Sequence, residues 1–572
     1  MAAQYSIPSE TKKLLLEGIL ANPLIRKNLP AGTSEAANKV SFVGSDSPSL
    51  PVNWRFAESI SALKGYEATI LNVLLKEKYG IEPVPVTINT DHAQLFIMST
   101  LIWTLDPAGV NLPASCITDP SRRAELEKYF PTWDKHDSVG SWYRADATNI
   151  YKTKDEKFFH LHGSMNPDPT LKSIGLPANM DFTTPEEATA YIQDAVAKYT
   201  AEELQALADG HKQAGTICWT KEEFKASEHG KANAHAGLFD LEAVPNPNQR
   251  PGWWTSSVPR TSPARPLAGL KVVDLTRVIA GPSISRGLAE LGASVMRITA
   301  PHLPDMSVLH PDLNHGKWNA CLDLREEADR KKLRDLILGA DVFLQGYRPG
   351  VLDKYGFGED DVIKMCEARG RGIVYCGENC YGWRGPWMGR SGWQQISDAC
   401  CGVSYEFGRA MGNNEPVTPV FPNSDYCTGV CGVVGIITAL LRQAEHGGSY
   451  KVKVALNYYS QWLVNSCGMY PLEVWQDVWQ CNGSPVFRHY HSMHYLMPRV
   501  LGAVQKSSAD KLFKEEFFTQ YFVKSLGKTM RIVAPILQFP NQEVKLGFDV
   551  GTRTNGVDEA RWPQDLSVEN VE

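Results

Sequence analysis

The alternation of short apolar segments with amphipathic ones between residues 267 and 376 constrains the fold of this chain more than any other feature. The apolar segments have the length of single strands, and helical periodicity follows each of them. Pro282 suits the first turn of a helix, and Gly292 and Gly339 stand where two helices would end. Strands are expected at residues 271–275, 294–298, 341–345 and 372–376, and helices at 282–291, 326–338 and 359–367. Strands that alternate with helices predict an α/β fold with a doubly wound parallel sheet.

A segment rich in Pro, Ser and Arg from residue 244 to residue 266 predicts a linker, because it has neither helical nor strand periodicity. It divides the 572-residue chain into residues 1–243 and 267–572, each long enough for its own core. A weak similarity connects the two parts. Residues 70–96 and 436–463 both predict a helix, a short turn, an alternating strand and a second helix. Either the duplication of a whole domain or a chance likeness of amphipathic elements accounts for this similarity.

The composition and net charge argue against nucleic acid, a membrane or a metal ion as a partner of this chain. Apolar residues make up 43% and charged residues 21%, and the net charge of −6 offers no basic footprint for nucleic acid. The apolar run 429–441 is shorter than the roughly 20 residues that span a bilayer, and the first residues lack the pattern of a secretory signal. The 12 cysteines lack the spacing of a metal site. We therefore expect a cytoplasmic protein with reduced thiols, no metal and neither membrane nor nucleic acid as a partner.

A series of short motifs runs through residues 267–425. In chain order the motifs are LAGLKVVDLTRVIAGP at 267–282, LGASV at 291–295, NHGK at 314–317, LDL at 322–324, GADV at 339–342, YRPG at 347–350 and PNSD at 422–425. In this order they resemble the class III coenzyme A transferases (the CaiB/BaiF family). That family includes formyl-CoA transferase and carnitine CoA-transferase, and its superfamily includes α-methylacyl-CoA racemase.

The resemblance implies an enzyme that moves coenzyme A from an acyl-CoA donor to a carboxylic acid acceptor. It places a CoA-binding α/β domain with the nucleophile at residues 267–464 and the C-terminal completion of the same unit at 465–572. Residues 1–243 resemble a second, degenerate copy, with the helix–strand unit and a small α+β domain but without the CoA-binding portion. Because family members form interlocked dimers, this internally duplicated form implies an internal pseudo-dimer, and further oligomerisation stays open.

Asp425 matches the nucleophilic aspartate of the family. On this carboxylate the family forms an anhydride and then an aspartyl-CoA thioester, which is covalent catalysis. Because Asp425 stands at the start of an apolar helix, we expect an N-cap residue with a low pKa. By the same matching, contacts with CoA or acyl-CoA are expected at Arg277, Val278, Ile279, Ala280, Lys317, Tyr347, Arg348 and Lys354.

Gln394 departs from the family pattern, since many members carry a carboxylate at this position. In racemases an aspartate there belongs to the acid–base pair, and an amide cannot take a proton from carbon. Gln394 remains a candidate catalytic residue as a hydrogen-bond donor, and Asp398, one helical turn on, is an alternative carboxylate. Two other functions stay open. One is another acyl-CoA reaction on the same scaffold, by a racemase or epimerase, a dehydratase or a lyase. The other is a catalytically silent protein that binds acyl-CoA.

Overall fold

A seven-stranded sheet forms the centre of the C-terminal part of the chain. The computed structural model describes residues 5–256, 258–540 and 543–572. The strand order is β11-β10-β9-β12-β13-β14-β8, and all neighbours are parallel except β14 and β8. The strands are β8 (Asp240–Val244), β9 (Lys271–Leu275), β10 (Ser294–Thr299), β11 (Lys317–Cys321), β12 (Val342–Gln345), β13 (Val374–Asn379) and β14 (Ser449–Ala455). The prediction of an α/β fold with a parallel sheet is confirmed, and the fourth predicted strand is displaced, beginning and ending later than expected.

Helices cover both faces of this sheet. Successive strand residues point to opposite faces, so Val272 packs into one apolar cluster and Val273 into another. The cluster that holds Val272 includes α13 (Ala280–Glu290) and α19 (Asn423–His446), and these two helices contact each other. The cluster that holds Val273 includes α15 (Glu327–Leu338) and α16 (Glu359–Met365). The sheet is therefore buried on both faces, which explains why its strands read as continuous apolar runs.

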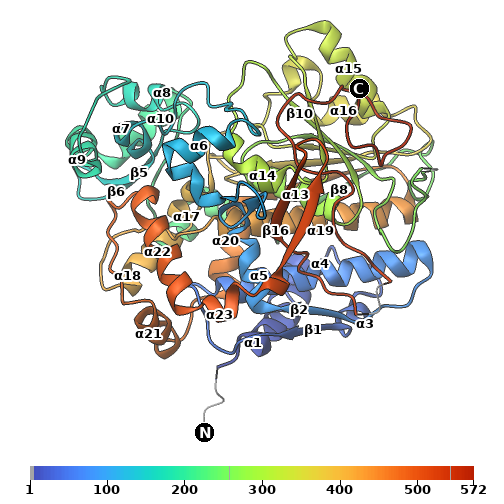
Figure 1. Cartoon of the computed structure of the whole chain (residues 1–572), viewed down its shortest axis with the longest axis horizontal. Helices are drawn as coiled ribbons and strands as arrows, with labels where there is room; N and C mark the ends of the chain where they lie inside the picture. Colours follow the sequence, from blue (N-terminus) through green and yellow to red (C-terminus); the bar gives the residue numbers. More distant parts are fainter. Residues whose placement is uncertain (1–4, 257, 541–542) are drawn as a thin grey trace.

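Helix α19 is the core helix of the molecule. It has 24 residues, and by length and composition alone it passes as a membrane span. The apolar part of α19 that passes this test is, however, wholly buried inside the protein, as core helices are. It packs on α13 and β14 on one side and along α4 (Phe56–Tyr79) of the N-terminal part on the other (Figure 1).

The N-terminal part repeats this arrangement on a smaller scale. Helix α4 also has 24 residues and leads into β2 (Val86–Asn89) and the seven-residue helix α5 (Thr90–Phe96). Helix α19 likewise leads into β14 and the seven-residue helix α20 (Leu456–Trp462). Strand β2 pairs in parallel with β1 (Val40–Val43), as β14 pairs with β13. Within the described residues, this sheet consists of the two strands β1 and β2, and Thr87 of β2 also forms an isolated antiparallel bridge with Gln538.

A smaller α+β unit lies beside the large sheet (Figure 1). Its antiparallel sheet is built from β5 (Asn149–Lys152), β6 (Phe158–His162) and β7 (Ala214–Ile217). Helices α8 (Asp168–Ser173), α9 (Pro185–Val196) and α10 (Ala201–Gly210) complete it. The turn after β6 and the turn before β7 face the carboxyl edge of the large sheet, where both contribute to a shared cavity.

Strand pairing crosses the predicted boundaries at residues 243 and 464. Strand β8 joins the edge of the large sheet through β14. The C-terminal strands β15 (Phe518–Val523) and β16 (Lys528–Val533) form one antiparallel sheet with β3 (Thr104–Leu105) and β4 (Leu112–Pro113).

Part of the predicted linker is also packed. Trp254 is buried, its indole N–H donates to the Ala268 carbonyl at 2.9 Å, and the Lys78 ammonium lies 3.3 Å from the ring centroid. The two parts of the chain therefore share sheets and core and do not stand as separate globules.

Candidate active site

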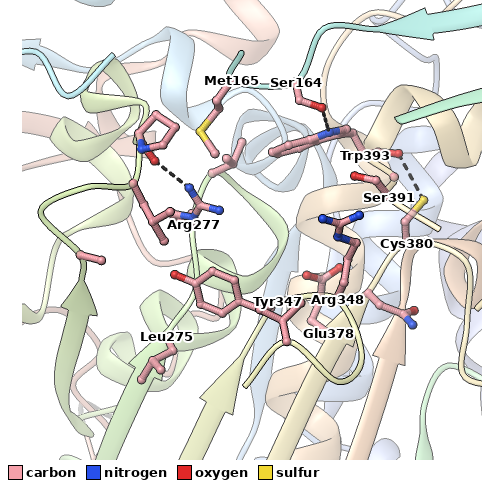
Figure 2. A pocket seen from close by; sticks show the side chains of 18 of the residues that line it. Ser164, Met165, Leu275, Arg277, Tyr347, Arg348, Glu378, Cys380, Ser391 and Trp393 are labelled. Carbon is pink, nitrogen blue, oxygen red and sulfur yellow. Dashed lines mark hydrogen bonds between the residues drawn. The ribbon is translucent and has the colours of Figure 1, made fainter. Parts of the chain in front are cut away.

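A cavity of about 620 Å³ opens at the carboxyl edge of the parallel strands. Its floor is formed by the ends of β9, β10, β12 and β13 and by the first turn of α19, where Leu275, Thr299, Gly346, Glu378 and Asp425 lie. Ligands of open α/β sheets bind at this edge, where loops diverge from the strand ends. The opposite wall comes from the smaller α+β unit. There the Ser164 hydroxyl accepts a hydrogen bond of 3.0 Å from the Trp393 indole N–H, and Figure 2 shows Ser164 and Met165 on the far side of the space from Leu275 and Tyr347.

The structure brings most of the predicted site residues together in this cavity. Those that line it are Arg277, Val278, Ile279, Ala280, Tyr347, Arg348, Lys354 and Asp425. The Arg277 guanidinium donates to the Pro304 carbonyl at 2.7 Å and lies 5.3 Å from the Tyr347 ring centroid. Arg348 donates to the Lys212 carbonyl of the smaller unit at 3.2 Å. These bonds fix two cations at the wall while leaving other guanidinium N–H groups for an anionic ligand.

Val278, which lines the cavity, and Phe421, four positions before Asp425, have unusual backbone conformations. Val278, in the loop between β9 and α13, has φ 72°, and Phe421, just before α19, has φ 74°. A β-branched residue such as valine rarely adopts a positive φ, because its Cβ substituents crowd the backbone. Such strain persists only where the surrounding structure enforces it, and it concentrates at functional sites. Both loops that approach the Asp425 side of the cavity are therefore held in costly conformations.

Lys317 lies outside the cavity, contrary to the prediction. It belongs to β11 and is fully buried; its ammonium donates to the Pro282 carbonyl at 2.9 Å and lies 3.5 Å from the Asp274 carboxylate. Burial lowers the pKa of Lys317 to about 7. The side chain thus fastens the first turn of α13 to the sheet and does not line the cavity, and its contact with CoA stays a prediction.

Gln394 also lies behind the cavity wall and does not line it. It is the first residue of α17 (Gln394–Cys400), and its amide donates to the Asp398 carboxylate one turn on. The other Asp398 oxygen accepts a hydrogen bond of 3.4 Å from the Ser424 hydroxyl. Burial raises the pKa of Asp398 to about 7, against the lowering effect of these two donors. Gln394 is therefore hydrogen-bonded to Asp398, and Asp398 is hydrogen-bonded to Ser424 in the first turn of α19.

Asp425 is not the N-cap residue that the sequence suggested. The N-cap is Pro422, and Asp425 is the third residue of α19. Among residues 5–256, 258–540 and 543–572, the structure gives its carboxyl group no hydrogen-bond donor. Burial, and then the nearby Glu378 and Asp398, raise the pKa of Asp425 well above its ordinary value. The expectation of a low pKa is therefore wrong, because desolvation and like charges outweigh the helix dipole.

Glu378 is a cavity residue that the motif reasoning missed. It lies near the end of β13 and is 9% exposed, and burial raises its pKa to about 8. Figure 2 shows its carboxyl group pointing into the cavity. Had the predicted strand been extended past residue 376, Glu378 would have fallen at the carboxyl edge, where ligands bind. Among the described residues, the structure holds no cluster of His, Cys, Asp or Glu suited to a metal ion.

Comparisons with known proteins identify the class of enzyme to which this site belongs. Residues 267–478 match the family model of CoA-transferase family III. The chain is 52% identical to the acetyl-coenzyme A transferase nodX of Hypoxylon pulicicidum, over 100% of this chain and 96% of that protein. It is 31% identical to an acyl-CoA transferase of Gibberella moniliformis, over 94% and 92%. A solved CAIB/BAIF family protein from Brucella suis is 28% identical over 35% of this chain and 56% of its own, with a TM-score of 0.31.

The chain is thus an enzyme of the coenzyme A transferase class. It belongs to CoA-transferase family III, as the sequence motifs predicted.

Proposed function

We propose that this enzyme transfers coenzyme A from an acyl-CoA donor to a carboxylic acid acceptor through an aspartyl-CoA thioester on Asp425. The observation that carries the proposal is the position of Asp425. Its carboxyl group opens onto the cavity at the start of a buried helix and has no hydrogen-bond donor among the described residues. A carboxylate that makes no structural bonds is available as a nucleophile. The full-length similarity to an acetyl-coenzyme A transferase supports acetyl-CoA as the acyl-CoA donor.

The reaction consists of four acyl transfers. The Asp425 carboxylate attacks the thioester carbonyl, the C–S bond breaks, and a mixed anhydride and free CoA thiolate result. The thiolate then attacks the Asp425 carbonyl carbon of the anhydride, which releases the donor acid and leaves aspartyl-CoA. The acceptor carboxylate displaces the thiolate in the same way, and the thiolate finally attacks the acceptor acyl carbon. The Asp425 carboxylate is restored, and no net proton is consumed.

The loops on the Arg277 side supply the contacts that coenzyme A needs. The nucleotide end carries phosphates, for which cations and main-chain N–H groups at a helix start are suitable partners. Arg277, Arg348 and Lys354 provide the cations, and the first turn of α13 at Ala280 provides the N–H groups. The thioester end then points to Asp425, on the side where Trp393 and Cys380 close the cavity. Because Asp425 is buried, it keeps a raised pKa and is a strong nucleophile once it is ionised.

We also propose that the chain is an internally duplicated, cytoplasmic form of the family, with the large sheet doubly wound. The matching series α4–β2–α5 and α19–β14–α20 supports a duplication, as does the close packing of α4 on α19. In the described part of the chain, the sheet of the N-terminal copy has the two strands β1 and β2 and offers no nucleotide-binding edge comparable to that of the large sheet. The two copies would then form a pseudo-dimer with one CoA site per chain.

Mass spectrometry of the chain after incubation with acetyl-CoA tests the proposal. We expect a CoA adduct on the peptide that contains Asp425 in the wild type and in the control Asp510→Asn, which changes an exposed aspartate. Asp425→Asn should show no adduct, since an amide does not form the anhydride. A wild-type enzyme that transfers CoA with no adduct at Asp425, or with an adduct at another residue, would overturn the mechanism.

A further inference from the structure

Glu378 is a second buried carboxyl group in the cavity, and the four transfers proposed above do not use it. Only 9% of its surface is exposed, and within the described ranges no hydrogen-bond donor to its carboxyl oxygens is present. Burying a polar group without a hydrogen-bond partner destabilises a fold. A carboxyl group held in this way at the edge of a ligand cavity indicates a partner that arrives with the substrate.

The neighbouring strand is shaped to make room for this carboxyl group. One Glu378 oxygen lies only 3.2 Å from the point where a Cβ on Gly346 would stand, so a side chain at Gly346 would press on it. Gly346 follows β12 and lines the cavity floor together with Glu378 and Asp425. The carboxyl group therefore leans over the end of the adjacent strand, on the same floor as the proposed nucleophile.

The polar groups around Glu378 make no hydrogen bond with its carboxyl group in the described residues. The titratable and charged groups that share its electrostatic environment or its cavity are Asp425 on α19, Asp398 on α17, Cys376 and Cys380 along its own segment, Arg277, His302, Tyr347, Arg348, Lys354, Tyr355 and Arg390 on the surrounding segments, and His136 and Lys212 from the N-terminal part. Gln394 is bonded to Asp398 behind the wall. Asp398 is bonded to Gln394 and Ser424. Glu378 is thus the carboxyl group beside Asp425 that is left free to touch a substrate.

We propose that Glu378 is a further catalytic residue, which in its protonated form donates a hydrogen bond to the acyl oxygen that becomes negatively charged when Asp425 attacks the thioester. The inference rests on the function proposed above. The proton stays on Glu378 throughout, and the bond it makes is stronger to the oxyanion than to the ground-state carbonyl oxygen. A neutral carboxylic acid in an apolar site is an effective donor of this kind.

The electrostatics of the cavity agree with this role. Burial raises the pKa of Glu378 to about 8, so the group holds its proton at neutral pH. The charge of an ionised Glu378 would raise the pKa of Asp425 further, whereas a protonated Glu378 removes this repulsion. Like-charge repulsion therefore disfavours the state in which both carboxyl groups are ionised, and the two titrate together.

The test compares Glu378→Gln and Glu378→Ala with the wild type and with Glu77→Gln, a control that changes an exposed glutamate on α4. Glutamine keeps an N–H donor but does not titrate. We expect Glu378→Gln to keep kcat within about tenfold of wild type at pH 7 and to lose the decline in rate near pH 8. Glu378→Ala should lower kcat by about 10²–10³-fold with little change in KM, as for the loss of one oxyanion donor. Gly346→Ala places a methyl group against the Glu378 carboxyl group. It should also lower kcat while changing KM little.

Two results would overturn the inference. The first is a kcat near that of wild type in Glu378→Ala. The second is a Glu378→Gln variant as inactive as Glu378→Ala although it is folded by circular dichroism, because the carboxylate itself would then be required. The CoA adduct separates this inference from the function on which it rests. If the wild type shows no adduct on Asp425, the proposed function fails. If the adduct forms equally fast in wild type and Glu378→Ala, only the role of Glu378 fails.

Discussion

Replacing Glu378 with Gln should change how the stability of the protein depends on pH. Burial raises the pKa of Glu378 from 4.5 to about 8 in the folded state. Since the folded state holds this proton more tightly than the unfolded state, the contribution of Glu378 to stability is fully present below about pH 4.5. It is lost progressively as pH rises towards 8. Gln does not titrate, so position 378 contributes no such pH-dependent decrease to the stability of the variant.

The size of the effect follows from the interval between the two pKa values. At about 1.4 kcal/mol for each tenfold change in proton affinity, the interval from 4.5 to about 8 corresponds to a loss of at most about 5 kcal/mol at high pH. Between pH 5 and pH 7.5 the loss amounts to about 3 kcal/mol. The free energy of unfolding of the Gln variant, relative to wild type, should therefore rise by about 3 kcal/mol over this range, whatever its value at pH 5.

Urea unfolding at a series of pH values measures this difference, and melting temperatures provide a second readout. An unfolding entropy of about 2.1 cal/mol/K per residue converts 3 kcal/mol into a relative rise in Tm of about 2–3 °C for this chain. The exposed control Glu77→Gln should follow wild type at every pH. A Glu378→Gln variant whose stability difference from wild type stays constant from pH 5 to pH 7.5 would refute the reasoning, because Glu378 would then titrate alike in both states.

Three further predictions concern the nucleophile, the reaction class and the sheet. Asp425→Ala and Asp425→Asn should each lower kcat/KM at least about 10³-fold in a CoA-exchange assay; activity within about tenfold of wild type contradicts the assignment. Acetyl-CoA incubated with the enzyme in deuterated water should gain no α-deuterium at the catalytic rate, because transfer through Asp425 removes no α-proton; rapid exchange without transfer would favour a racemase. Lys317→Met should destabilise the fold by about 1–3 kcal/mol in urea unfolding, because Asp274 loses its buried cation and keeps only the Thr276 and Ser285 hydroxyl donors; an unchanged midpoint would show that the pair is dispensable.

The sequence by itself determined the local architecture of the C-terminal part and the family. The strands at β9, β10 and β12 were predictable because apolar runs of strand length alternate there with amphipathic segments, and such a pattern has few other solutions. The motifs were enough to single out Asp425 and the loop Arg277–Ala280, because these residues are close together in the chain or fall at recognisable points of it. All of them line the cavity.

Only the tertiary structure decided which groups face the cavity and how they are charged. Lys317 and Gln394 matched by position, but packing turns Lys317 towards Pro282 and Gln394 towards Asp398. Glu378 belongs to no motif, and only an extension of the predicted strand past residue 376 would have placed it at the carboxyl edge; its proximity to Asp425 arises from the pairing of strands and the placing of α19. The raised pKa of Asp425 likewise depends on burial and on Glu378 and Asp398, which lie 47 and 27 positions earlier in the chain. Desolvation and like-charge repulsion act through space, so a linear pattern that predicts a helix start does not predict the pKa of the carboxyl group placed there.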